Sequence, residues 1–117
     1  MHVVAQILVG LVALIHGYIL VLEMFLWRTD RVRATFGTTP EFAAASSALA
    51  ANQGLYNGFL AAGLVYGLIA DSLAFQVFFL VCVIVAGVYG TLTATRKILY
   101  VQVLPAAVAL LFVLLAR

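Results

Sequence analysis

The few side chains of this sequence that could do chemistry are a carboxyl group, an imidazole, and a set of amides and phenols. Glu23 and His16 could act as acid and base or as anchoring groups. They are nearly two helical turns apart, so they would share one helix face. The set predicts acid–base work on a lipophilic substrate or binding without turnover, and it leaves open whether the protein is an enzyme. The side chains predicted to bind the ligand are Asn52, Gln53, Tyr56, Asn57, Tyr89 and Gln102.

Each of these residues also has a purely structural interpretation. Glu23 could extend to the membrane interface and pair with Arg28, Arg96 or Lys97. His16 could form a hydrogen bond between helices, and the amides could hold helices together at about 0.6 kcal/mol each. We favour a ligand site because an ionisable residue inside a membrane segment is a functional-site hypothesis by default. Three amides within six residues also exceed what helix packing usually needs.

The sequence lacks the motifs of several other kinds of site. It has no glycine-rich phosphate loop with a lysine, no zinc-spaced histidine pair and no nucleophile elbow. No metal site is predicted, and no cofactor can be named. His2 and His16 are badly placed to hold one haem together, although one histidine from each of two subunits stays open. The net charge of +2 is too small and too scattered for nucleic-acid binding.

The composition indicates a membrane protein. Of 117 residues, 67% are hydrophobic and only 9% are charged, whereas a soluble domain carries about 25% charged residues. Because water cannot be the solvent for most of this surface, we predict an integral membrane protein. The first apolar segment lacks the basic start and the small-residue cleavage site of a signal peptide, so we expect it to be a retained membrane helix.

Four long apolar segments predict an all-α fold, a four-transmembrane-helix bundle that forms a single domain over 1–117. Crossing about 30 Å of hydrocarbon needs roughly 20 residues in a helix. Thr39 and Pro40 predict a helix start, Asp71 predicts an N-cap for the next helix, and Pro105 predicts a kink. The predicted helices cover about 3–27, 40–70, 73–95 and 98–116, with a polar loop over 28–40.

Basic side chains divide unevenly between the two sides of such a bundle. Arg117 is on one side, and five of the six Lys and Arg residues lie in two connections on the other. The positive-inside rule therefore predicts a multi-pass protein of the inner (plasma) membrane with both termini outside the cytoplasm. The five cytoplasmic residues would be Arg28, Arg31, Arg33, Arg96 and Lys97.

Most polar side chains of the four segments lie toward the predicted cytoplasmic ends. Unpaired polar groups in hydrocarbon cost several kcal/mol each, so these groups should face one another or water. We therefore predict a polar pocket between the helices that opens to the cytoplasm. Gly54, Gly58, Gly87 and Gly90 predict surfaces on which neighbouring helices approach closely. The same faces could pair two subunits, so a homodimer is expected.

A set of short motifs runs along almost the entire chain. It consists of His16, LEMFLW at 22–27, FG at 36–37, PEF at 40–42, LAANQGLYNGFLAAGL at 49–64, VYG at 88–90, Gln102 and PA at 105–106. These motifs resemble the hallmark of a family of small bacterial and fungal integral membrane proteins, domain of unknown function 1304. The resemblance implies a four-helix membrane protein and implies no particular activity.

Three functions are compatible with these observations. The first is a pocket that binds or transforms a small lipophilic molecule. The second is a proton-coupled transporter that uses Glu23, as in small multidrug exporters, although the strong charge bias argues against the dual orientation of the best-known exporters. The third is a non-catalytic accessory or assembly protein. The expected partners are membrane lipids, a lipophilic small molecule and a second copy of the chain, without nucleic acid.

Overall fold

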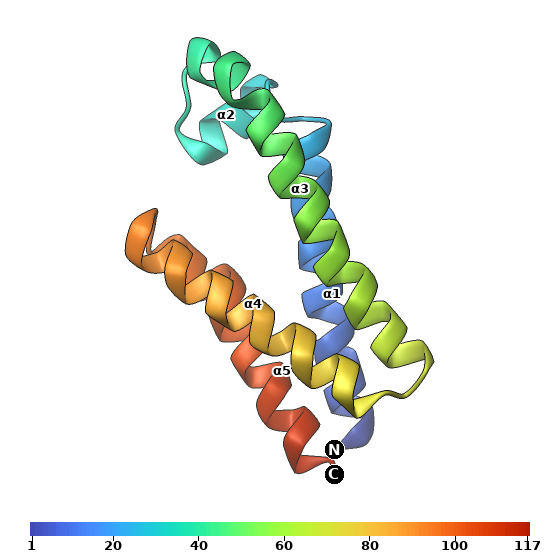
Figure 1. Cartoon of the computed structure of the whole chain (residues 1–117). Coiled ribbons are helices and arrows are strands. Elements are labelled where there is room, and N and C mark those ends of the chain that lie inside the picture. Colours follow the sequence, from blue (N-terminus) through green and yellow to red (C-terminus); the bar gives the residue numbers. More distant parts are fainter. The chain divides into compact units, whose positions relative to one another are not determined.

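The all-α prediction is confirmed in the computed structural model, which describes all 117 residues. Figure 1 shows helices joined by short connections and no strand. A π-helical turn, η1, comes directly before the last helix. The elements are α1 (His2–Met24), α2 (Asp30–Phe36), α3 (Pro40–Ile69), α4 (Leu73–Thr93), η1 (Leu99–Val103) and α5 (Leu104–Leu115).

Two of these helices, α1 and α4, are long and apolar enough to cross a membrane. The helix α3 is longer than either, but the amides of Asn52, Gln53 and Asn57 interrupt its apolar sequence. The last apolar segment, Leu99–Leu115, which comprises η1 and α5, is shorter than α1 and α4.

The contacts group the residues into two compact units. The first, which we call the α2 unit, is His16–Phe59, and it contains α2, the last turns of α1 and the first half of α3. The second, which we call the α4–α5 unit, consists of Met1–Ile15 and Leu60–Arg117.

The helix α2 lies where the sequence predicted a polar loop. The Thr29 hydroxyl caps it by accepting a hydrogen bond from the Val32 N–H, 3.4 Å away. Asp30 lies in the first turn and pairs with Arg33 one turn later. Gly37 ends the helix in the left-handed conformation, at φ 71°. Cap, ion pair and stop residue together form a short helix that apolar periodicity cannot reveal.

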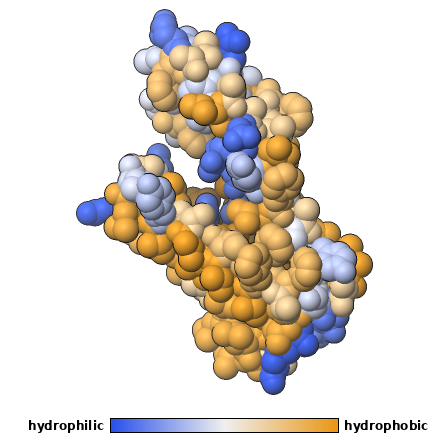
Figure 2. Space-filling model, viewed as in Figure 1, coloured by the Kyte–Doolittle hydropathy of each residue, from blue (hydrophilic) through white to orange (hydrophobic).

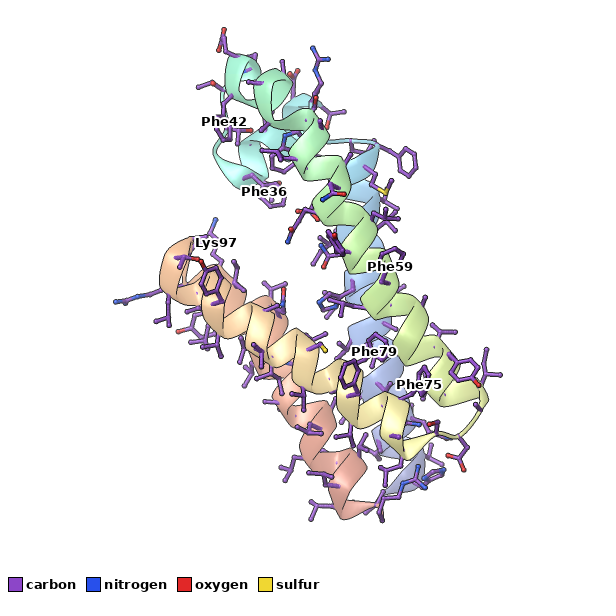
Figure 3. All side chains as sticks on the ribbon, viewed as in Figure 1. Phe36, Phe42, Phe59, Phe75, Phe79 and Lys97 are labelled. Carbon is purple, nitrogen blue, oxygen red and sulfur yellow. The ribbon has the colours of Figure 1, made fainter.

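The start of α3 and an aromatic contact hold α2 in place within its unit. The helix α3 begins at Pro40 as predicted, and the Thr39 hydroxyl accepts from the Phe42 N–H at 3.1 Å. The Trp27 indole N–H donates to the Ser46 hydroxyl at 3.1 Å, and its ring centroid is 5.1 Å from that of Phe36. Figure 3 shows Phe36 on α2 and Phe42 on the first turn of α3.

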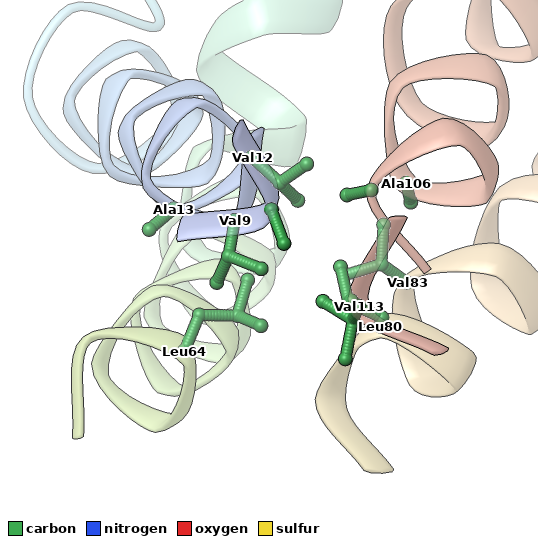
Figure 4. Close-up of a cluster of buried hydrophobic side chains, with 10 residues drawn as sticks. Val9, Val12, Ala13, Leu64, Leu80, Val83, Ala106 and Val113 are labelled. Carbon is green, nitrogen blue, oxygen red and sulfur yellow. The ribbon is translucent and has the colours of Figure 1, made fainter. Parts of the chain in front are cut away.

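The core of the α4–α5 unit is formed by aliphatic side chains from four helices (Figure 4). Gly63 lies so close to Phe79, labelled in Figure 3, that an added Cβ would overlap its ring. The buried Gln76 amide donates to the Gly67 carbonyl at 2.9 Å, joining α4 to α3. Residues of this core include Val9, Val12, Leu64, Leu80, Val83, Ala106, Ala109 and Val113.

The turn between α3 and α4 differs from the prediction in its capping residue. Ser72, and not Asp71, caps α4, accepting from the Phe75 N–H at 3.2 Å. Asp71 instead adopts a left-handed conformation, at φ 48°, and pairs with Arg117 at 3.4 Å. A residue in that conformation closes the turn, so the N-cap position moves to the next residue.

The predicted disturbance at Pro105 takes the form of the π-helical turn. Pro105 lies in the first turn of α5, and the Leu104 N–H bonds back to the Leu99 carbonyl, one residue further than in an α-helix. The Gln102 amide in this turn donates to the Val83 carbonyl of α4 at 2.9 Å. Gly87 permits this approach, since an added Cβ would lie 2.6 Å from Val103 Cγ2.

Candidate functional site

One hydrogen bond joins the two helices of the α2 unit through residues that the sequence singled out. The Asn57 Nδ2 donates to the Glu23 Oε1 at 2.8 Å. The same nitrogen lies 3.2 Å from the Gln53 carbonyl one turn earlier, which fixes the orientation of the amide. Asn57 is buried, with 8% of its surface exposed, and Glu23 is partly buried. A carboxyl group in the last turn of α1 is thus held by a neutral amide of α3.

The helices α1 and α3 approach each other closely enough for this hydrogen bond to form. An added Cβ on Gly54 would lie 2.7 Å from Met24 Cγ and 3.1 Å from Glu23 Cβ. An added Cβ on Gly58 would lie 2.5 Å from Leu20 Cδ1. The two glycines flank Asn57 on the face that meets α1, so a side chain as short as asparagine can reach the carboxyl group.

A hollow of about 290 Å³ lies beside Glu23 within the α2 unit. Its wall is formed by seven residues, which carry one carboxyl group, one guanidinium, two hydroxyls and three apolar or aromatic side chains. Such a wall suits an amphipathic molecule, with polar groups and an apolar part. The lining residues are Glu23, Met24, Phe25, Trp27, Arg28, Thr29 and Ser47.

The remaining residues of the predicted site are spread over the two units. His16 is in the α2 unit and fully buried. Asn52, Gln53 and Tyr56 are exposed on α3. Tyr89 and Gln102 belong to the α4–α5 unit, where Tyr89 is 70% exposed and Gln102 bonds a carbonyl of α4. Glu23 and Asn57 are therefore the two predicted site residues whose side chains share a hydrogen bond.

Six of the seven lining residues, all except Glu23, were not among the predicted site residues. Met24, Phe25 and Trp27 appeared only in the family motif at 22–27, Arg28 was assigned to the cytoplasmic connections, and Thr29 and Ser47 carried no assignment. For five of the six the available signal was position, because they lie within 24–29, directly after Glu23 in the chain. No group of three or more His, Cys, Asp or Glu side chains gathers anywhere in the chain.

Comparison with known proteins places the chain in one family. The model of a family described as "Protein of unknown function (DUF1304)" matches residues 10–114. The "Uncharacterized protein YpaA" of Lactococcus lactis subsp. lactis (strain IL1403) is 34% identical over 106 residues, which is 87% of this chain and 89% of that protein. No solved structure matches the chain. On the family match and this relative together, the chain belongs to the DUF1304 family.

Proposed function

We propose that the protein spans the inner (plasma) membrane four times, through α1, α3, α4 and Leu99–Leu115. The exposure of its apolar helices supports this proposal. Only 28% and 22% of the most apolar windows of α1 and α4 are buried within the protein. Over α4, the face shown in Figure 2 is mainly hydrophobic, with Phe78, Val85 and Leu92 more than half exposed. Apolar helix surface of this extent suits lipid rather than water.

The basic connections then determine the orientation. Arg28, Arg31 and Arg33 lie at and within α2, and Arg96 and Lys97 lie between α4 and η1. With four spans, these connections share the cytoplasmic side, and both termini and the α3–α4 turn lie outside.

The orientation is tested by attaching a membrane-impermeant thiol reagent to single cysteines. In a Cys82→Ser background, Ala34→Cys in α2 should react only after the membrane is opened, because α2 faces the cytoplasm. Ala70→Cys in the α3–α4 turn should react in intact cells. Both alanines are exposed and both changes are small, so each variant is a control for the other. Labelling of both positions from the same side would contradict four spans.

The function we propose is the binding of a small, partly lipophilic molecule in the hollow beside Glu23. The observation that carries the proposal is the Glu23–Asn57 hydrogen bond at the wall of the hollow. A carboxyl group placed in a membrane helix is costly, and such groups usually serve a site. Asn57 holds one oxygen of the carboxyl group, and Glu23 lines a space whose wall also contains Met24, Phe25 and Trp27. Glu23 would anchor the polar end of the ligand.

The sole tryptophan of the chain lines the hollow, so its fluorescence reports occupancy directly. Brominated dodecanol, an amphiphile that quenches tryptophan on contact, should quench Trp27 saturably in the purified protein. Glu23→Gln should weaken this binding about tenfold, the loss of one hydrogen bond to a charged group. Asn57→Ala should weaken it too, because the carboxyl group loses the amide that positions it.

Two matched variants serve as controls for this experiment. Glu41→Gln is the control for Glu23→Gln, because it makes the same substitution at an exposed carboxyl group. Asn52→Ala is the control for Asn57→Ala, because it removes an exposed amide of α3. Both should bind the brominated dodecanol as the parent does. Equal quenching in all five proteins, or none in the parent, would refute a ligand site at Glu23.

A further inference from the structure

A residue with a carboxyl group and a residue with a guanidinium line the hollow without pairing with each other. Glu23 bonds the neutral amide of Asn57, and no ion pair joins it to Arg28. The Arg28 guanidinium forms no hydrogen bond with another residue, although its backbone carbonyl accepts from Arg33 at 3.4 Å. The neighbouring Asp30 is occupied by Arg33. Two residues of the wall, Glu23 and Arg28, thus have side chains with hydrogen-bonding capacity left for a ligand.

From this arrangement, and on the basis of the proposed function, we infer that the ligand of the hollow is the headgroup of a zwitterionic aminophospholipid of the ethanolamine type. Its primary ammonium group would donate to Glu23 beside the aromatic ring of Trp27, a combination that attracts cations. Its phosphodiester would accept from Arg28, whose fork of N–H groups matches phosphate oxygens.

The size and position of the hollow favour a lipid headgroup over a free metabolite. About 290 Å³ is at the lower end of small-molecule sites, roughly 300–1,000 Å³, so a headgroup fits and a whole lipid does not. Acyl chains need an apolar exit, and Phe25, which is 71% exposed, lies on the wall beside Met24. Trp27 and Arg28 follow the end of α1 in the order typical of the headgroup layer.

The chemistry of the two charged residues also predicts which headgroups are rejected. Choline carries three methyl groups in place of N–H donors, so it cannot hydrogen-bond Glu23. Glycerol lacks the cation altogether. Serine adds a carboxylate, which the Glu23 carboxyl group would repel. Selectivity among lipids with identical acyl chains therefore reports on headgroup recognition alone.

The experiment measures quenching of Trp27 by phospholipids with brominated acyl chains, each at the same mole fraction in mixed micelles. The ethanolamine lipid should quench with an affinity about tenfold above those of the choline and glycerol lipids, as one charge-assisted hydrogen bond would give. Glu23→Gln should abolish the preference over the glycerol lipid, and Arg28→Ala should weaken binding of all three. Arg31→Ala, an exposed arginine outside the hollow, should change nothing.

The alternative outcomes separate this inference from the proposed function. Equal quenching by the three lipids, or tighter binding of the glycerol lipid, would overturn the headgroup assignment. If brominated dodecanol still bound in a Glu23-dependent way, the proposed function would stand. Soluble glycerophosphoethanolamine carries the same ammonium group and phosphodiester without acyl chains and should not displace the ethanolamine lipid at equal concentration. Displacement would show that the ligand is a water-soluble compound and that the lipid assignment is wrong.

Discussion

Gly54→Val is expected to destabilise the protein by about 1–3 kcal/mol, the typical cost of overpacking a close contact. Even a single Cβ at this position would lie 2.7 Å from Met24 Cγ and 3.2 Å from the Leu20 carbonyl oxygen. The Met24 side chain could move aside, but the backbone oxygen cannot unless α1 shifts away from α3. That shift would also lengthen the hydrogen bond between Asn57 and Glu23.

The measurement is the free energy of unfolding in a detergent titration, and Gly17→Val is the matched control. Gly17 lies inside α1 as Gly54 lies inside α3, and a Cβ added at Gly17 meets no atom within 4 Å. Both substitutions therefore change helix propensity alike. The difference between their losses in free energy of unfolding measures the contact at Gly54. If the two variants lose the same stability, α1 and α3 do not approach each other at Gly54.

The sequence predicted the helix α3 and the depth of its polar residues, but it could not separate their faces. Depth along a helix follows from residue number alone, so Asn52, Gln53 and Asn57 were treated as one group. In the structure Asn57 is buried and the other two are exposed. The discriminating signal was present in Gly54 and Gly58, because the small residues mark the face that meets a neighbouring helix. Asn57 lies between them on that face.

Residues 28–40 show a different limit of sequence reasoning. Their charges, glycine and proline are typical of a loop, and their apolar residues are too few to show a helical period. The helix α2 depends instead on the cap at Thr29, the Asp30–Arg33 pair and the left-handed Gly37. Seven residues of helix are marginal without tertiary contacts. Packing of the buried Val32 stabilises α2 only after the unit has folded.

Asn57→Leu should cost about 1–3 kcal/mol of stability, because it leaves the Glu23 carboxyl group without its amide partner. Asn52→Leu is the control, since it makes the same change on an exposed position of the same helix. On the proposed four-span topology that variant should be neutral or slightly stabilising, because an apolar group replaces an amide on a surface exposed to lipid. Equal effects at the two positions would indicate that Asn57 does not hold Glu23.

The double variant Glu23→Met with Asn57→Leu then separates structure from function. Replacing both partners by apolar groups of similar size removes the unsatisfied carboxyl group, so most of the lost stability should return. If the residues serve only to hold the helices together, as in an accessory protein, the double variant should be equivalent to the parent in every assay. If they form a ligand site, the double variant should be stable and should still fail to bind brominated dodecanol. A ligand site thus predicts that the double variant regains stability without regaining binding of brominated dodecanol. If the double variant regained both, a ligand role for Glu23 would be ruled out.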